Sequence, residues 1–222
     1  PYTTLFRSVF VFLAGTTTAS PEQMTVSSVG WYMTMTQVWE TVLVLPAVIA
    51  LLGSYMICRE EQDDTIKNLS LIPVNERKLT AAKMIILFLF SILAYVLLFL
   101  LTFSTEMVLH ASELSIKIFF DFLKMYLLEG IGVFFAVSPI IALVPYLKKN
   151  YWLALAVAEI YSFAGLFMSM SNTLRTFYPI TAIFGVSGYY ETTAQEKLCS
   201  LLVLLLCGIV ALIFLKKLNR RR

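Results

Sequence analysis

Charged side chains are scarce in this 222-residue sequence, at 14% of the residues, whereas 59% are hydrophobic. A soluble domain carries about 25% charged residues. The mean hydropathy of +0.81 leaves little sequence for a domain outside a membrane, since six spans of about 20 residues occupy roughly 120 positions. The net charge of +3 is too small to indicate nucleic-acid binding. The composition therefore excludes a water-soluble globular protein and predicts a membrane protein.

Cysteine and histidine are also few. Cys58, Cys199 and Cys207 lie within or at the ends of apolar runs, with no CxxC pair, so neither a zinc site nor a disulfide framework is indicated. His110 is the one histidine, which excludes an HExxH protease, and we expect it to be a solvated residue of an outer loop. The phosphate-binding pattern GxxxxGK[ST] is missing, so the chain cannot hydrolyse ATP itself. We therefore predict no enzymatic activity and no metal or cofactor bound by this chain.

Five stretches without Asp, Glu, Lys or Arg are candidate membrane helices. They cover residues 41–58, 84–105, 130–147, 160–174 and 198–215. We expect the third and fourth of these helices to begin earlier, near Tyr126 and Tyr151. Apolar residues around 5–19 add a first helix, which we expect to be shortened because the chain opens without Met. The prediction is an all-α polytopic fold of six transmembrane helices, the first truncated, in one domain over residues 1–222.

Basic residues predict which side of the membrane each loop occupies, because loops retained in the cytoplasm collect Lys and Arg. One side receives Arg59, Lys67, Arg77, Lys78, Lys83, Lys148, Lys149, Lys216, Lys217, Arg220, Arg221 and Arg222. The other side receives only Lys117, Lys124, Arg175 and Lys197. We therefore place the first side, with the C-terminus, in the cytoplasm.

Residues 172–197, on the predicted outer side, are too apolar for an ordinary loop. Positions 177–185 read Phe-Tyr-Pro-Ile-Thr-Ala-Ile-Phe-Gly, which is too short to span a membrane, and we expect Gly185 and Gly188 to break this segment. Aromatic side chains favour the membrane interface, and irregular backbone at depth must be covered by protein. We expect a re-entrant segment that dips into the outer leaflet before the last helix.

The predicted cytoplasmic loop at 59–83 has the densest pattern of the chain. Its acidic residues come first, so that Asp63 or Asp64 can cap a short helix at its positive N-terminal end. Three apolar residues then share one face of that helix: Ile66, Leu69 and Ile72. This pattern fits a short amphipathic helix under the membrane that receives force from a cytoplasmic partner, and it also fits a solvated loop whose basic residues only fix the topology.

The order of residues in this loop resembles the first cytoplasmic loop of ABC-2-type transporter permeases, and within that class it is most similar to bacitracin and lantibiotic exporter or immunity permeases. The resemblance rests on the acidic cluster after the second span, the run Thr-Ile-Lys-Asn-Leu, a proline, and Arg and Lys before the third span. In such permeases the loop is a coupling helix that docks on the ATP-binding subunit, which implies that residues 60–72 do so here. The implied coupling residues are Glu60, Glu61, Asp63, Asp64, Thr65, Ile66, Lys67, Leu69 and Ile72.

Three acidic residues, Glu40, Glu129 and Glu159, fall in or near the predicted spans. An ionisable group in hydrocarbon is costly, so a functional role is the default hypothesis. We expect Glu40 and Glu129 to reach the outer headgroups from the ends of their helices. Glu159 lies deeper, beside small residues that include Ser162 and Gly165, so it either hydrogen-bonds a neighbouring helix or lines a substrate path.

The resemblance implies the permease subunit of an ABC exporter in a bacterial plasma membrane. The implied cargo is an amphipathic peptide antibiotic or a lipid-like molecule, as in antibiotic resistance or lantibiotic immunity. The implied partners are a separate ATPase subunit, which binds ATP and Mg²⁺, and a second permease chain, identical or different. Two other interpretations stay open: an ion-coupled secondary transporter in which Glu159 titrates, and a membrane scaffold that transports nothing.

Overall fold

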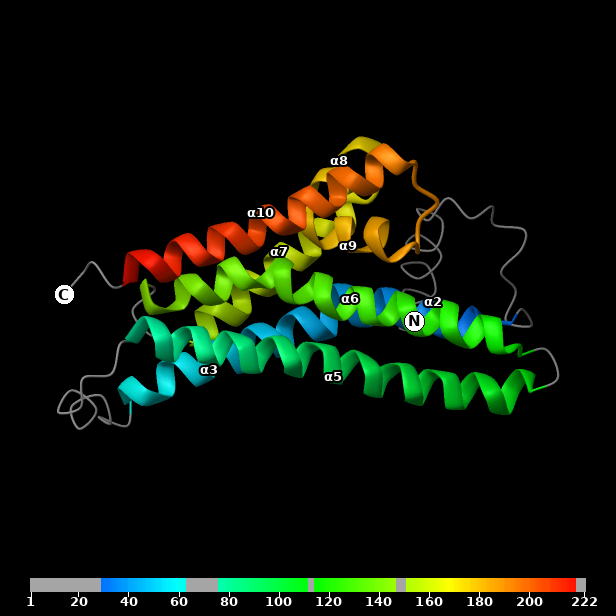
Figure 1. Ribbon diagram of the computed structural model, residues 1–222, viewed down its shortest axis with the longest axis horizontal. Coiled ribbons are helices and arrows are strands. Elements are labelled where there is room, and N and C mark those ends of the chain that lie inside the picture. The colour runs from blue at the N-terminus through cyan, green and yellow to red at the C-terminus, as the bar shows by residue number, and fades with distance from the viewer. Residues whose placement is uncertain (1–28, 63–75, 112–113, 147–150, 219–222) are drawn as a thin grey trace, which may run out of the picture.

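The computed structural model describes residues 29–62, 76–111, 114–146 and 151–218, and this part of the chain is an all-α bundle (Figure 1). Its elements are α2 (Trp31–Trp39), the π-helical turn η1 (Glu40–Val44), α3 (Leu45–Gln62), α5 (Glu76–His110), α6 (Ile116–Leu143), the 3₁₀ turn η2 (Val144–Tyr146), α7 (Tyr151–Met168), α8 (Asn172–Phe177), α9 (Pro179–Ser187) and α10 (Ala194–Leu218). The predicted first helix, around 5–19, lies outside the described residues.

Four described helices are long and apolar enough to cross a membrane. They are Trp31–Arg59, Lys78–His110, Ile116–Tyr146 and Ala194–Lys217. Crossing about 30 Å of hydrocarbon takes about 20 helical residues, and each of the four is longer than that. A fifth apolar helix, Trp152–Met168, is shorter. The prediction of an all-α polytopic membrane protein is confirmed.

The long helices run side by side, so that the bundle has two ends (Figure 1). At one end α3 and α10 finish and α5 begins, and the basic residues there include Arg59, Lys78, Lys83, Lys216 and Lys217. We call this the basic end. At the opposite end α5 finishes and α6 begins, and α8 and α9 lie near the start of α10.

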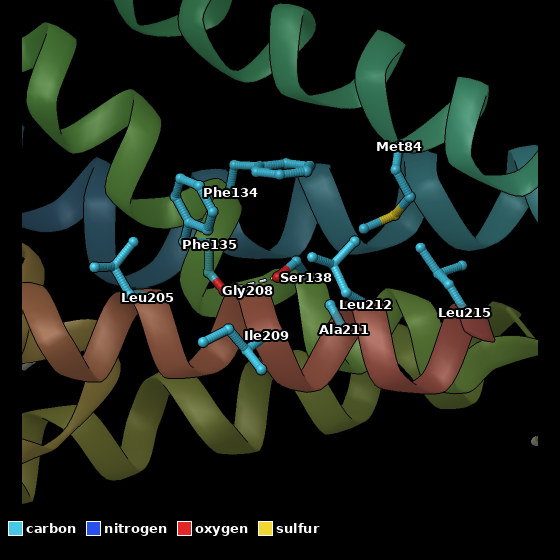
Figure 2. A pocket seen from close by; sticks show the side chains of 10 residues that line it. All are labelled: Met84, Phe134, Phe135, Ser138, Leu205, Gly208, Ile209, Ala211, Leu212 and Leu215. Carbon is cyan, nitrogen blue, oxygen red and sulfur yellow. Dashed lines mark hydrogen bonds between the residues drawn. The ribbon is translucent and has the colours of Figure 1, made fainter. Parts of the chain in front are cut away.

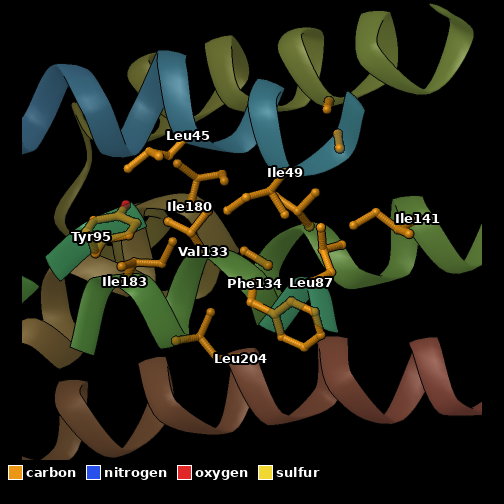
Figure 3. Packing of buried hydrophobic residues seen from close by; sticks show 14 of the residues in the cluster. Leu45, Ile49, Leu87, Tyr95, Val133, Phe134, Ile141, Ile180, Ile183 and Leu204 are labelled. Atoms are coloured by element: carbon orange, nitrogen blue, oxygen red, sulfur yellow. The ribbon is translucent and has the colours of Figure 1, made fainter. Parts of the chain in front are cut away.

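Helix α6 occupies the centre of the bundle and packs on α3, α5, α9 and α10. Figure 3 shows side chains of these helices meeting in the core, among them Val133 and Ile141 of α6, Leu87 of α5 and Ile183 of α9. All four are nearly or fully buried. By contrast, α5 turns a stripe of leucines outward at every fourth position: Leu89, Leu93, Leu97 and Leu101. An exposed apolar stripe of this kind fits a surface that faces lipid.

Helices α6 and α7 differ from the predicted boundaries in opposite directions, since α6 begins earlier than predicted and α7 ends earlier. Helix α6 begins at Ile116, well before the predicted start near Tyr126, and contains three charged residues in its first turns. Helix α7 begins at Tyr151 as predicted but ends at Met168 rather than near 174. Charge near a helix end is compatible with a helix that continues beyond the hydrocarbon, so apolar runs underestimate its length.

The segment after α7 forms two short helices rather than one interrupted stretch. In α9 the six residues 180–185 are all buried, so the apolar segment is covered by protein as expected. Gly188 ends α9 with a φ of +94°, where glycine is favoured, but Gly185 does not break the helix. A Cβ at Gly185 would come within 2.9 Å of Ser200 Oγ, so this glycine allows α10 to approach α9. The predicted break at Gly185 is wrong.

Candidate functional site

Most of the predicted coupling loop lies outside the described residues. Glu60 and Glu61 form part of the last turn of α3, which extends to Gln62. The remaining coupling residues, Asp63, Asp64, Thr65, Ile66, Lys67, Leu69 and Ile72, lie in the segment 63–75, which the structure does not describe. The coupling role of residues 60–72 therefore stays a prediction, and the structure shows what the loop is attached to.

The two helices that flank this loop, α3 and α5, are joined closely at the basic end. The ammonium group of Lys83 on α5 donates a hydrogen bond to the backbone carbonyl of Met56 on α3. One turn further into the bundle, Gly53 lets the helices approach, because a Cβ there would lie 2.7 Å from Leu87 Cδ2 and 3.0 Å from Ile141 Cγ2. These contacts hold α3 and α5 together next to the segment that joins them.

Replacing Gly53 with valine is expected to separate α3 from α5 and α6 and to lower the thermal unfolding midpoint of the purified protein. Overpacked core positions typically lose about 1–3 kcal/mol, and both neighbours of Gly53 belong to the buried core. The matched control is Ala82→Val at an exposed position of α5, which should leave the midpoint unchanged. Equal unfolding midpoints for the two variants would show that Leu87 and Ile141 move aside for the valine without a loss of stability.

Helix α7 presents small side chains to α3 and α9. Ala158 and Ser162 are fully buried, and a Cβ at Gly165 would lie 3.3 Å from Ile180 and from the Tyr178 ring. Small residues at such positions allow close helix approach without a long side chain between the helices. Ser162 and Gly165 thus lie at a helix–helix contact inside the chain.

Glu159 lies elsewhere on α7, on the outer surface of the bundle. It is partly exposed and lines a shallow groove whose other lining residues are apolar. These are Ala156, Ile160, Phe163, Ala164 and Phe167. Ser162 and Gly165 face the contacts inside the bundle, whereas Glu159 is partly exposed and lines the groove without them. An ionisable side chain on an apolar membrane helix calls for a partner that covers it.

A different glutamate, Glu129 of α6, is the fully buried acid in the centre of the bundle. Gln37 Nε2 of α2 donates a hydrogen bond of 2.8 Å to Glu129 Oε1, and Thr41 Oγ1 of the π-helical turn donates one of 3.0 Å to Glu129 Oε2. Tyr95 of α5 donates its hydroxyl to Thr41 Oγ1 at 2.9 Å. We call these four residues, all fully buried, the carboxyl network. The network ties together the helices α2, α5 and α6.

The expectation that Glu129 reaches the outer headgroups is wrong. Because α6 begins at Ile116, Glu129 lies near the middle of this 28-residue helix rather than at its end. Its side chain also points to α2 and the π-helical turn rather than to the surface. Glu40, in the same turn as Thr41, is partly exposed. The interhelical hydrogen bond that the sequence suggested for Glu159 is thus made by Glu129.

A second buried acid, Glu106 of α5, was missed because it follows the apolar run 84–105. Glu106 is fully buried and accepts a hydrogen bond of 2.7 Å from the backbone nitrogen of Gly30, at the start of α2. His110 is the last residue of α5, with Nδ1 2.9 Å from Glu106 Oε1 and a side chain only 16% exposed. The prediction that His110 is a solvated loop residue is wrong. The spacing of four residues, which places both side chains on one helix face, could have revealed this pair.

Comparison with known proteins gives a family and one curated relative. The profile described as ABC-2 family transporter protein matches residues 1–165 of the 222. The chain is 24% identical over 188 residues to the bacitracin transport permease protein BCRB of Bacillus licheniformis, an alignment that covers 83% of this chain and 89% of that protein. No solved structure matches. Since the profile covers well over half of the chain and includes α2 to α6, which carry the predicted coupling loop and the carboxyl network, the chain belongs to the ABC-2 transporter family.

Proposed function

We propose that this chain is the permease subunit of an ABC exporter that moves an amphipathic peptide antibiotic or a lipid-like molecule across or out of a bacterial plasma membrane. A separate ATPase subunit binds ATP and Mg²⁺ and supplies the energy. A second permease chain, identical or different, completes the transport path. The C-terminus and the loop 59–83 face the cytoplasm.

The observation that carries this proposal is the similarity to a bacitracin transport permease along most of both chains. Membership of the ABC-2 family makes the chain a membrane component of a transporter rather than an enzyme. Bacitracin-like peptides are therefore the first cargo to test. Removal of such an antibiotic from the membrane would protect the cell that carries the transporter, as in antibiotic resistance and lantibiotic immunity.

The geometry of the described helices supports a route from the ATPase to the transport path. The ATPase closes on binding ATP and pushes the helix at 60–72, and the junction of Lys83 with Met56 moves α3 and α5 together. Helix α3 packs against α7, and at the basic end Cys58 of α3 is buried with Ala154 of α7. Movement of α3 therefore reaches α7, whose outer surface carries Glu159. This surface faces the second permease chain, and the cargo path opens between the two chains.

The proposal is tested by purifying the full-length chain from gently solubilised membranes and identifying the proteins that accompany it. We expect an ATPase subunit with the wild type and at least about tenfold less of it with Glu61→Lys combined with Asp64→Lys, because a tenfold loss of affinity needs only about 1.4 kcal/mol. The same variant should make cells as sensitive to bacitracin as cells that lack the transporter.

The matched control reverses two acidic residues at the opposite end of the bundle, Asp121→Lys combined with Glu191→Lys, both at exposed positions. This control should retain the ATPase and the resistance. If the wild type brings down no ATPase and transport follows the proton gradient, the ABC proposal fails and an ion-coupled transporter takes its place. If the loop variant binds the ATPase normally, residues 60–72 are not the coupling helix.

A further inference from the structure

An apolar groove lies between α5, α6 and α10 in the half of the bundle nearer the basic end (Figure 2). Its volume is about 260 Å³. The lining residues are Met84, Phe134, Phe135, Ser138, Leu205, Gly208, Ile209, Ala211, Leu212 and Leu215. Met84, Ala211 and Leu215 are buried in its floor, whereas Ile209 and Leu212 are about half exposed on its rim. The groove therefore opens on the outer surface of the bundle.

The groove exists because α10 packs on α6 and only weakly on α5. Gly208 of α10 meets the ring of Phe135 of α6, where a Cβ would lie 2.8 Å from Phe135 Cδ1. Toward the basic end, α10 and α5 stay apart, and the side chains of Met84 and Leu215 face the space between them (Figure 2). The result is an elongated apolar space beside the Phe135 contact.

The lining offers almost nothing to a polar ligand. Its one polar side chain, Ser138, donates its hydroxyl to the backbone carbonyl of Phe135 at 2.9 Å. Recognition of a peptide needs hydrogen-bonding groups that fix its orientation, and drug-sized ligands occupy pockets of about 300–1,000 Å³. A smaller space with apolar walls suits a single hydrocarbon chain.

Two lysines lie on α10 next to the groove, on the side that faces the basic end of the bundle. Gly208, Leu212 and Lys216 follow one another at intervals of four on α10, so they lie in one row on the helix, and the first two line the groove. Lys216 and Lys217 are both exposed, directly after Leu215. No Asp or Glu occurs in residues 197–222 of the sequence. An anionic group held near these lysines therefore meets no opposing charge from the end of α10.

We propose that the groove binds one anionic phospholipid, with an acyl chain between α5 and α10 and its phosphate at Lys216 and Lys217. Basic residues beside an apolar cleft at the membrane surface suit such headgroups, because each Lys near a membrane contributes to the attraction of anionic lipid. The bound lipid fills the gap between α5 and α10 and links α10 to α5, the helix that follows the predicted coupling loop. This inference concerns a lipid site and goes beyond the proposed transport function.

The test is native mass spectrometry of the full-length protein, in complex with its partners, after exchange into detergent with equal amounts of phosphatidylglycerol and phosphatidylcholine. The wild type should retain phosphatidylglycerol at least about tenfold over phosphatidylcholine, as expected when two lysines favour the anionic lipid. Leu212→Trp fills the groove and should abolish this retention. Ile213→Trp is the matched control, because Ile213 is as exposed as Leu212 (55% against 59%) but does not line the groove.

A third variant distinguishes binding of the lipid headgroup from binding of its acyl chain. Lys216→Gln combined with Lys217→Gln should remove the preference for phosphatidylglycerol. Equal retention of the two lipids by the wild type, or equal retention of phosphatidylglycerol by Leu212→Trp and Ile213→Trp, would overturn the proposal. Loss of the second permease chain from the complex with Leu212→Trp alone would also overturn it, since the groove would then be a subunit contact. Lipid retention is measured without transport, so its failure leaves the proposed function intact.

Discussion

Replacing Glu129 with leucine is expected to lower the free energy of unfolding clearly, because its carboxyl group is fully buried in the centre of the bundle. The substitution removes the acceptor of two buried donors, Gln37 Nε2 and Thr41 Oγ1. A buried donor without a partner costs about 1–3 kcal/mol, and hydrogen bonds between membrane helices average about 0.6 kcal/mol. With both donors affected, we expect the free energy of unfolding to fall by about 2 kcal/mol. The measurement is the unfolded fraction of the protein during titration with a denaturing detergent.

Two controls isolate the carboxyl network from a general effect of the substitution. Glu159→Leu makes the same chemical change at a partly exposed position and should leave the stability of the single chain almost unchanged. Glu129→Gln keeps the size of the side chain and one acceptor oxygen. It should therefore lower the free energy of unfolding by less than half as much as Glu129→Leu. If Glu129→Leu and Glu159→Leu are equally stable, the network does not hold α2, α5 and α6 together.

The contrast between Glu129 and Glu159 shows what the sequence could and could not predict. Each of the five apolar runs overlaps a described apolar helix, and four of these helices are long enough to cross a membrane. The prediction succeeds to this extent because length and hydrophobicity are local properties. The partner of a buried glutamate is decided by which faces of distant helices meet. Gln37 and Glu129 are 92 positions apart, and no local pattern places them together.

Charged residues also led the sequence analysis to end helices too early, so that a buried acidic residue was missed. The acid Glu106 stopped the predicted third span at 105, although α5 continues to His110, with Glu106 fully buried and His110 partly buried. A charge at the end of an apolar run can therefore mark a buried contact rather than the membrane surface. Glycine is also ambiguous in a sequence, because it can end a helix or allow two helices to pack closely. Gly185 allows α10 to approach α9, whereas Gly188 ends α9 with a positive φ.

Substituting Glu159 with arginine is expected to reduce transport at least about tenfold, which corresponds to about 1.4 kcal/mol, while the single chain stays folded. In the proposed pair of permease chains, the outer surface of α7 packs against the second chain and buries Glu159. Arginine adds bulk and places an isolated charge in that contact, which is costly away from water. Glu159→Gln retains the size and the hydrogen-bonding groups and should keep both the pair and ATP-driven transport.

The contact itself can be tested by cysteine cross-linking in chains whose three native cysteines are alanine. Phe163→Cys on the α7 surface should cross-link two permease chains, whereas Leu97→Cys on the leucine stripe of α5 should not, although the two positions are equally exposed (49% and 52%). Cross-linking at both positions or at neither would remove the reason for placing Glu159 between the chains. The variant Glu159→Gln then separates the remaining roles, because a structural or path-lining glutamate tolerates it. An ion-coupled carrier loses transport with glutamine even when the pair is intact, since the amide cannot exchange a proton.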